Sequence, residues 1–437
     1  MSQSNEFYLP ENPQYTIFDS MKDSVGFTIN RTLTTYKGNL CAKSSFIDQE
    51  GTPQPWHEFG NLEGVGWAAN AVGGSYELYR YASYTKDDEI KNTALSILNH
   101  CLEAGFIDYN TGFITPYRDL REDKFYLNYL HSAKSDRWFC AGSMAKVAYQ
   151  LLICSDLMED GARKGRMIEA AVKNARWIKD HIKLAPNGWY PRRSRPTGEA
   201  YDQVASQHER FKAADGTSPD PQFDHSGDGL FIVQLMAELT ARGLSDYRQE
   251  VEERTRLFVR SGGFYGSINH DTYDDRENVS YAVAFRVLRR VADLLGDKEI
   301  RDFAYDDALA RLVRYEMRED RNGVATKGLL YMEESWDTAY LWENAEASLA
   351  YMEAYHDTRS EVYLSKGLTI LRAIAKHHHG KYGFLTEGVD WNNHVGAKHH
   401  LDGAEYGDIK YTEPFLNNLH ITEPTLYYLE ELSGGNS

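Results

Sequence analysis

One short motif returns five times along this chain of 437 residues, and its spacing restricts the possible folds more than any other feature. A glycine followed by an aromatic or aliphatic residue stands after every second helical segment. The five copies are GFID at 105, GWYP at 188, GFYG at 263, GLLY at 328 and GFLT at 383. A polar loop and another helical pattern follow each copy. Helix pairs that repeat in this way must stack on their neighbours, because one pair cannot bury both its faces alone.

The segment 281–295 has the clearest helical pattern, with apolar residues on two faces at spacings of three and four. One face holds Tyr281, Phe285, Leu288, Ala292 and Leu295, and the other holds Val283, Val287, Val291 and Leu294. Two apolar faces predict a helix that is buried on both sides.

Twelve helices are expected from such patterns and from their start and stop residues. The expected ranges are 15–36, 62–84, 88–104, 138–157, 162–182, 229–244, 247–260, 281–295, 298–317, 338–356, 361–377 and 418–432. Six pairs that close on themselves form an all-α toroid, with the first helix on the outer ring and the last on the inner ring. An open solenoid of the TPR or HEAT kind is the alternative. The unequal repeat lengths and the long connections on one side of each pair favour the closed scaffold.

The order of helix, glycine-aromatic turn, charged loop and alanine-rich helix resembles the (α/α)6-toroid carbohydrate-active enzymes. These include unsaturated glucuronyl hydrolases and uronate-specific polysaccharide lyases. The run SDRWF at 135 is similar to the segment with which an inner helix of the glucuronyl hydrolases opens. The resemblance covers nearly the whole chain. It implies a single catalytic domain over residues 1–437 and a substrate that contains uronic acid, whereas the mechanism stays open.

Composition excludes some partners. The net charge of −17 argues against a nucleic-acid surface, which needs clustered positive charge. The 30 Tyr, 18 Phe and 8 Trp residues are weak support for sugar binding, since aromatic rings form flat amphipathic platforms. No stretch has membrane-spanning length, so we expect a soluble protein without membrane contact. Its compartment is either the cytoplasm or, if an export signal has been removed, the periplasm or the exterior.

Metal and cofactor signals are weak. The four cysteines have no CxxC spacing and are expected to be free buried thiols. The runs 377–379 and 399–400 are rich in histidine, but no HExxH motif occurs, and adjacent residues seldom converge on one ion. The first run, followed by Gly380, is more simply a cationic end of a helix. We therefore predict no metal and no cofactor.

Three residues at the entries of inner helices are the predicted catalytic group. His225, in FDHSGDG, is expected to act as a base or as a carboxylate partner. Tyr281 is expected to exchange a proton with the sugar, and Arg276 to clamp the uronate carboxylate. Two of them have a structural alternative: His225 as a histidine that bonds a neighbouring loop, and Tyr281 as a tyrosine that packs in the core. The acidic residues of these loops have the alternative role of helix N-caps.

The predicted substrate-binding residues lie in the loops at the same rim. His57 and Asn61 are expected across the ring from the catalytic group. The loop 187–223, a possible lid, brings Arg192 and Arg193 into an acidic protein and suggests an anion site. The other residues predicted to bind substrate are Arg137, Trp138, Trp336, Tyr340, Trp391 and His394. The last loop also contributes His420.

These assignments favour β-elimination at the uronate of an acidic oligosaccharide, with a sugar or water as the leaving group. Two other functions remain open. A glycoside hydrolase would use paired carboxylates from among Asp136, Asp228, Asp337 and Glu343. A non-catalytic helical scaffold would need no such polar cluster. The sequence does not predict the oligomeric state.

Overall fold

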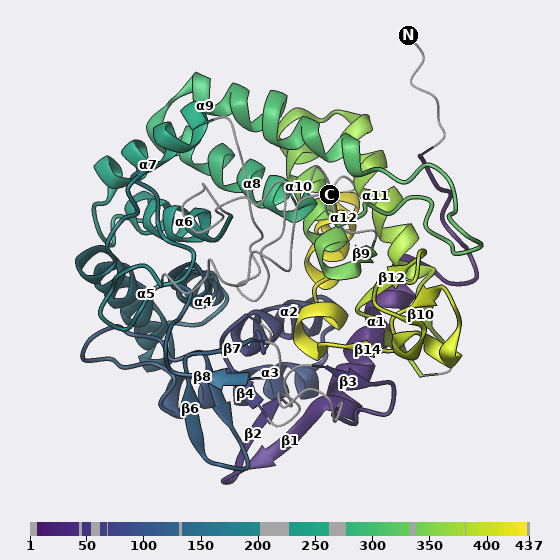
Figure 1. Cartoon of the computed structure of the whole chain (residues 1–437), viewed down its shortest axis with the longest axis horizontal. Helices are drawn as coiled ribbons and strands as arrows, with labels where there is room; N and C mark the ends of the chain where they lie inside the picture. Colours follow the sequence, from purple (N-terminus) through teal and green to yellow (C-terminus); the bar gives the residue numbers. More distant parts are fainter. Residues whose placement is uncertain are drawn as a thin grey trace.

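Six helices surround a common axis and six others surround them in the computed structural model (Figure 1). The structure describes residues 7–42, 46–53, 62–67, 69–130, 133–201, 227–261, 277–332, 338–380 and 382–434. The expected (α/α)6 toroid is therefore confirmed.

The inner helices are α2 (Ala71–Thr85), α4 (Ala141–Asp156), α6 (Gly227–Ala241), α8 (Asn278–Leu295), α10 (Leu341–Thr358) and α12 (Thr422–Gly434). Each packs on the next in this order, and α12 packs on α2, which closes the ring. The outer helices are α1 (Ile17–Phe27), α3 (Asp88–Glu103), α5 (Ala162–His181), α7 (Arg248–Ser261), α9 (Lys298–Phe303) and α11 (Glu361–Ala375). The first helix is outer and the last is inner, as the sequence predicts.

Short strands occupy the connections that lead from an outer helix to the next inner helix. The hairpins are β1 (Leu33–Tyr36) with β2 (Asn39–Ala42), β7 (Asn128–Leu130) with β8 (Ala133–Ser135), and β10 (His378–His379) with β11 (Phe384–Leu385). Strand β3 (Ile47–Asp48) pairs with β14 (Tyr411–Thr412). One three-stranded sheet holds β4 (Leu62–Gly64), β5 (Tyr117–Asp119) and β6 (Lys124–Tyr126), and another holds β13 (Gly407–Asp408), β12 (Gly388–Asp390) and β9 (Thr338–Tyr340). All of these pairs are antiparallel.

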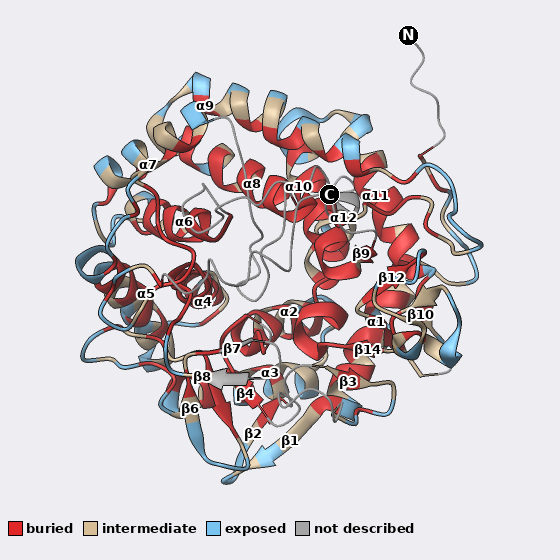
Figure 2. Cartoon of the chain, in the orientation of Figure 1, coloured by how far each residue is buried: buried red, intermediate tan, exposed pale blue. Residues whose placement is uncertain are grey.

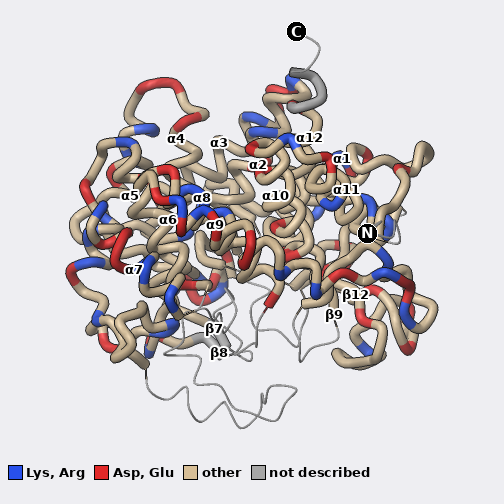
Figure 3. Tube along the Cα trace, turned by 90° about the horizontal axis from the view of Figure 1, so that it is seen from above, with Lys and Arg blue, Asp and Glu red and all other residues tan. Residues whose placement is uncertain are grey.

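Long connections gather on one side of the ring. In Figure 3, β7, β8, β9 and β12 lie below the helices, whereas the carboxyl end of α12 projects above them. The inner helices therefore begin on the side of the long connections, and that side is expected to carry the loops that recognise a ligand.

The repeated glycine has a backbone reason. Gly105, Gly188, Gly328 and Gly383 have φ values of +93°, +82°, +95° and +63°. Glycine adopts this left-handed region without steric cost, so the chain can turn sharply after an outer helix. The fifth copy, at Gly263, lies outside the described residues.

Small residues bring the inner helices close together. A Cβ atom built at Gly142 on α4 would lie 2.1 Å from the carbonyl oxygen of Asp228 on α6, so only glycine fits there. Figure 2 shows the consequence, an inner ring that is almost entirely buried while the outer helices expose one face. One large hydrophobic cluster extends from Phe7 to Leu426, and a small separate cluster joins Phe27, Ile47 and Phe384.

Ion pairs also join neighbouring inner helices. Arg286 on α8 contacts Glu346 and Glu353 on α10 at 2.7 and 2.9 Å. Arg290, further along α8, lies 2.9 Å from Glu238 on α6. These pairs cross the seams between helices that the apolar core also joins.

Several expected helix ends are wrong. Helix α1 ends at Phe27 and continues only as a π-helical turn (Thr28–Thr32) before β1, because the β-branched residues of RTLTTY favour an extended chain. Residues 62–64 form β4 rather than the start of α2, since they pair with β5. The range 298–317 divides into α9, a π-helical turn (Ala304–Leu309) and a 3₁₀ turn (Leu312–Tyr315).

The last expected helix, 418–432, begins later than predicted. A π-helical turn (Pro414–Asn418) comes first, and α12 starts at Thr422. Two 3₁₀ turns (Ala397–His399 and Leu401–Gly403) lie in the connection before it. Within the described ranges, no helix combines the length and the apolar character that crossing a bilayer requires.

Candidate functional site

A pocket on the axis of the toroid is lined by side chains from all six inner helices or the residues that enter them. It encloses about 600 Å³ free of protein atoms, part of it open to solvent. Its lining is Gly73, Tyr76, Glu77, Lys146, Tyr149, Gln150, Ile153, Phe231, Gln234, Val283, Arg286, Glu346, His420 and Glu423. We call this the axial pocket. It combines aromatic rings with acids, cations and amides, the mixture that a polar ligand such as a sugar needs.

His420 stands between two carboxylates at the entry of α12. Its Nδ1 lies 3.4 Å from Glu77 Oε1 on α2, and its Nε2 lies 3.2 Å from Glu346 Oε1 on α10. Burial alone would lower the pKa of this imidazole, but the bonds with Glu346 and Glu77 outweigh it and raise the pKa to about 9. His420 is therefore a buried cation at neutral pH and a possible proton donor.

The two carboxylates beside His420, Glu77 and Glu346, have pKa values that are shifted in opposite directions. Glu346 also contacts Arg286, and this cation together with His420 outweighs burial and holds the pKa of Glu346 well below its usual value. Burial dominates at Glu77 and raises its pKa, although His420 opposes the shift. Glu346 therefore stays ionised, whereas Glu77 is closer to exchanging a proton.

Lys146 on α4 is only 7% exposed and lines the same pocket. Its ammonium lies 3.9 Å from the ring centroid of Trp67 and 5.3 Å from that of Phe231. Among the described residues, Nζ has no hydrogen-bond partner. Burial lowers the pKa of Lys146 to about 8 despite the charges of Glu346 and Glu77.

An aromatic wall stands beside these charges. The rings of Trp67 and Trp342 meet edge to face at 5.0 Å, and Trp342 lies 6.4 Å from the His420 ring. Because aromatic rings exclude water from one side of the charged groups, they strengthen the electrostatic interactions inside the pocket.

The predicted catalytic group is only partly described. His225 and Arg276 lie outside the described residues. Tyr281 is 1% exposed on α8, and its ring packs 6.0 Å from that of Tyr315, with the Arg311 guanidinium 5.6 Å from its centroid. Both neighbours follow α9 on the outer ring. These contacts favour the core-packing alternative for Tyr281, and Val283, two residues on, lines the pocket instead.

Among the predicted substrate-binding residues, Trp138, Arg192 and Arg193 come together away from the axial pocket. The Arg193 guanidinium lies 4.4 Å from the centroid of the buried Trp138 ring. Arg192 Nε donates to Asp228 Oδ2 at 3.1 Å, and neither side chain is more than 3% exposed. Burial raises the pKa of Asp228 to about 6, although Arg192 opposes this. The two arginines are therefore held in buried contacts between α4 and α6.

Other predicted binding residues lie at separate places. Arg137 is exposed, and so is His394. Tyr340 precedes α10 and accepts a bond from Asn344 Nδ2 at its carbonyl oxygen, at 2.8 Å. Trp391 follows β12 and is 7% exposed. None of the described members of this predicted set lines the axial pocket, and His57, Asn61 and Trp336 lie outside the described residues.

The carboxylates considered for a hydrolase are scattered. Asp136 is exposed and lies 3.4 Å from Lys124, and Glu343 accepts a bond from Asn278 Nδ2 at 2.9 Å. Asp228 is the buried partner of Arg192, and Asp337 lies outside the described residues. The carboxylates that share the axial pocket are instead Glu77, Glu346 and Glu423.

The run 377–379 only partly matches the cationic helix end that the sequence predicts. His377 Nδ1 and His379 Nε2 lie 2.6 and 2.7 Å from the two oxygens of Asp408. Burial lowers the pKa of His378 to about 3, so this residue is neutral. Asp408 outweighs burial and raises the pKa of His377, in keeping with the predicted cation, but its place beside the run comes from β13, a pairing that no local pattern indicates.

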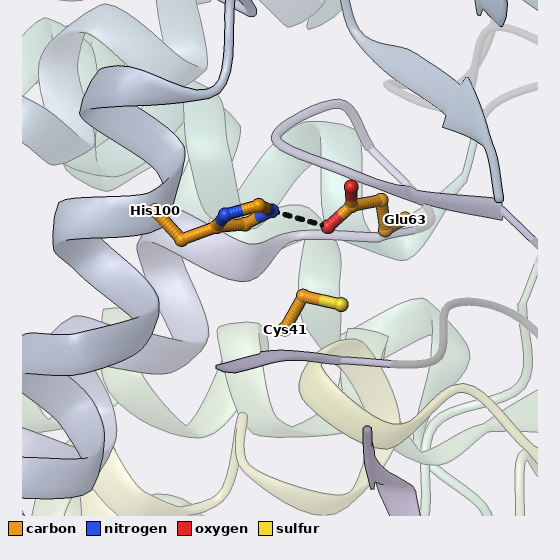
Figure 4. A group of neighbouring side chains, drawn as sticks. All are labelled: Cys41, Glu63 and His100. Carbon is orange, nitrogen blue, oxygen red and sulfur yellow. Dashed lines mark hydrogen bonds and ion pairs between the residues drawn. The ribbon is translucent and has the colours of Figure 1, made fainter. Parts of the chain in front are cut away.

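One group of described residues has metal-ligand chemistry, shown in Figure 4. Ligand atoms of Cys41, Glu63 and His100 lie within 4.8 Å of one another, and His100 Nε2 is 2.7 Å from Glu63 Oε2. Arg118, however, binds the same carboxylate through Nε at 2.8 Å and through Nη2, and its Nη2 is 3.4 Å from His100 Nε2. The guanidinium stands where a cation would bind, so this group does not fit a metal ion.

Comparisons with known proteins support the architecture alone. No protein-family model matches the chain, and no curated protein matches its sequence. Cellobiose 2-epimerase from Spirochaeta thermophila is similar in structure, with 12% identity, 96% of each chain covered and a TM-score of 0.63. The GH76 α-mannanase of Bacteroides thetaiotaomicron covers 96% of this chain and 98% of its own at 10% identity and a TM-score of 0.57. A possible GH105 member from Salmonella enterica covers 99% of both chains at 14% identity and a TM-score of 0.52.

Proposed function

We propose that this protein is an enzyme that transforms a saccharide in the axial pocket by moving protons between the sugar and its own side chains. The observation that carries the proposal is His420, held cationic between Glu77 and Glu346 in a pocket with aromatic walls. A protonated imidazole between two carboxylates beside a pocket can both give and receive protons, which is the chemistry that general acid–base catalysis requires. The similar solved structures, an epimerase and glycoside hydrolases, support the substrate class.

The leading reaction is β-elimination at the uronate of an acidic oligosaccharide. Glu77, whose pKa is raised, takes the proton from the carbon next to the carboxylate. The electron pair of that C–H bond forms the new C=C bond, the C–O bond breaks, and the leaving oxygen receives the proton of His420. Glu77 Oε1 and His420 Nδ1 are 3.4 Å apart, so the proton taken by the carboxylate returns to the imidazole once these two groups move into hydrogen-bond geometry.

Epimerisation or isomerisation is the second candidate, and the same contact favours it. A proton taken from the carbon next to a carbonyl group can be given back by a neighbouring donor, and Glu77 and His420 are such a pair. The similar structures include cellobiose 2-epimerase and D-mannose isomerase, each with a TM-score above 0.5.

One panel of substrates separates these reactions. The protein is incubated with uronate oligosaccharides while ultraviolet absorbance is followed, and with aldoses in deuterated water while proton spectra are recorded. Rising absorbance identifies elimination, and deuterium at the carbon next to the carbonyl identifies epimerisation or isomerisation. New reducing ends without either change identify a paired-carboxylate hydrolase and overturn the proton-abstraction mechanism.

Two variants connect the activity to the pocket. His420→Gln should lose the activity, whereas His356→Gln, at an exposed histidine near the far end of α10, should retain it. Full activity in His420→Gln, or no reaction on any of these sugars, would overturn the proposal.

A further inference from the structure

Lys146 differs from every other cation of the axial pocket. Arg286 contacts Glu346 and Glu353, and His420 contacts Glu77 and Glu346. Lys146 Nζ, by contrast, has no hydrogen-bond partner among the described residues, although Lys146 is only 7% exposed. Buried polar groups are nearly always hydrogen-bonded, so a donor left alone in a pocket indicates a missing acceptor.

The surroundings of Lys146 explain why the acceptor matters. Rings of Trp67 and Phe231 flank the ammonium, and aromatic faces offer it no hydrogen-bond acceptor of the strength of an oxygen. Glu346 and Glu77 act on it at longer range, as does Asp228 from α6, while Arg286 repels it from α8. His420, the remaining pocket cation, is already paired with both of these glutamates. A desolvated ammonium with only distant counter-charges binds an anionic oxygen strongly once one reaches it.

We propose that Lys146 binds the carboxylate of an acid sugar inside the axial pocket and so selects acidic over neutral saccharides. The inference deepens the proposed function, because it names the substrate class of the same pocket. A carboxylate held at Nζ has its charge neutralised, and neutralisation is what allows a proton to leave the adjacent carbon in an elimination. The binding itself is independent of turnover and is measured without it.

Binding of a carboxylate by Lys146 requires the protonated form of the amine. Above pH 8 the free protein holds a growing fraction of neutral Lys146, so a carboxylate binds only after the amine takes up a proton. Linkage then weakens uronate binding by roughly fivefold between pH 8 and pH 9. Binding of a neutral sugar does not require protonated Lys146, so its affinity changes little between pH 8 and pH 9.

The test uses pairs of sugars that differ only at C6. D-glucuronate against D-glucose, and D-galacturonate against D-galactose, are titrated calorimetrically into the wild type, Lys146→Met and Lys164→Met. Lys164, in the first turns of the outer helix α5, is the matched control, because it pairs with Asp160 at the surface. Circular dichroism and the melting temperature establish that each variant is folded.

The wild type should bind at least one uronate about tenfold or more tightly than its neutral partner, the scale of a charge-assisted bond. Lys146→Met should remove this preference for uronate over neutral sugar, and Lys164→Met should retain it. Equal binding of uronate and neutral sugar by the wild type, or a preference that survives in Lys146→Met, would overturn the inference. If Lys146→Met does not fold, the pH dependence of wild-type binding decides: flat uronate affinity between pH 8 and 9 overturns it.

The two proposals fail separately. Turnover of neutral sugars without uronate preference would remove the role of Lys146 and keep the proposed enzyme. A uronate preference that depends on Lys146, without turnover of any sugar, would keep the anion site and remove the enzyme.

Discussion

His420 Nε2 lies 3.2 Å from Glu346 Oε1, so the residue that leads into the last inner helix is bonded to the helix before it. Its other nitrogen faces Glu77 on the first inner helix, α2. One imidazole therefore joins both sides of the seam that closes the ring, and it also lines the axial pocket. Ring closure and the proposed proton chemistry depend on the same side chain.

Replacing His420 by glutamine should lower turnover by about a hundredfold or more, the usual scale for a positioned acid. Because the protonated form is the donor, the wild-type rate should fall as pH rises through about 9. The raised pKa has a consequence for stability too: the contribution of His420 is complete below its unfolded pKa of about 6.5 and is lost as pH rises through 9. Steady-state kinetics and thermal melts from pH 6 to 10 measure both effects. If the rate of His420→Gln still falls at alkaline pH as the wild-type rate does, the fall belongs to the titration of another group.

Adding a methyl group at Gly142 should destabilise the toroid by about 1–3 kcal/mol, the usual cost of overpacking. The new Cβ would lie 2.1 Å from the carbonyl oxygen of Asp228, and backbone cannot move aside cheaply. Gly165→Ala on α5 is the control: nothing lies within 4 Å of its Cβ, and the residue is exposed. This second change should stabilise the protein by about 0.5–1 kcal/mol, because alanine is the better helix former. Urea unfolding of both variants gives the difference, and equal values would refute close approach of α4 and α6.

Asp408→Asn should cost at least about 2 kcal/mol, since it breaks charge-assisted bonds to two histidines. Those histidines outweigh burial and hold the pKa of Asp408 below its usual value, while Asp408 outweighs burial and raises that of His377. A carboxyl group whose pKa is lowered by folding contributes stability that is lost as pH falls. A histidine whose pKa is raised by folding contributes stability that is lost as pH rises. The cost of the substitution should therefore be greatest between about pH 4 and 6.5. Chemical unfolding at pH 3, 5.5 and 9 checks this, and a cost independent of pH would exclude an ionic origin.

Tyr281→Phe distinguishes the two interpretations of that residue. Packing against Tyr315 and Arg311 predicts a turnover within about threefold of the wild type and a stability loss of about 1 kcal/mol. The catalytic interpretation requires a loss of about a hundredfold in turnover with little change in stability. Paired kinetic and unfolding measurements on this variant decide between them, and His225→Ala tested in parallel addresses its predicted partner.

Zinc should not stabilise the group of Cys41, Glu63 and His100, because the Arg118 guanidinium already binds the carboxylate. Burial, reinforced by Glu63, also raises the pKa of the Cys41 thiol and keeps it protonated. The melting temperature should stay unchanged on addition of EDTA or of stoichiometric zinc. A rise with zinc would mean that Arg118 leaves the carboxylate.

The toroid was predictable because its determinants are local and repeated. The spacing of Tyr281, Phe285 and Leu288 defines a helix, and the four described copies of the recurring glycine have a left-handed backbone in the turn that follows an outer helix. Predicted helix ends are wrong where strand pairing between distant segments competes with the local helical pattern. Residues 62–64, for example, pair with β5 more than fifty residues away. A single-domain organisation and a lid at 187–223 remain predictions, and residues 202–223 of this loop lie outside the described part.

The axial pocket was harder to foresee, since its charged residues do not lie in loops. Lys146, Glu77 and Glu346 sit within buried, small-residue helices, in AGSMAKVAYQ, AVGGSYELYR and LWENAEASLA. The sequence signal for these three residues is a charge inside a buried, small-residue helix rather than at its entry. His420 was found among the candidates because it does lie at an entry. Which of these charges face one another depends on ring closure, which no local pattern gives.

The contact between α2 and α12 also determines when the ring can close during synthesis of the chain. Arg80 Nη2 bonds Glu430 Oε2 at 2.7 Å across a sequence separation of 350 residues. At ribosomal rates of 5–20 residues per second, the flank of α2 that α12 covers waits roughly 20–70 s for its partner. During that interval an incomplete ring presents apolar surface, the kind of surface that chaperones recognise. Binding competence should therefore appear only as the last helix is released, rather than growing gradually with chain length.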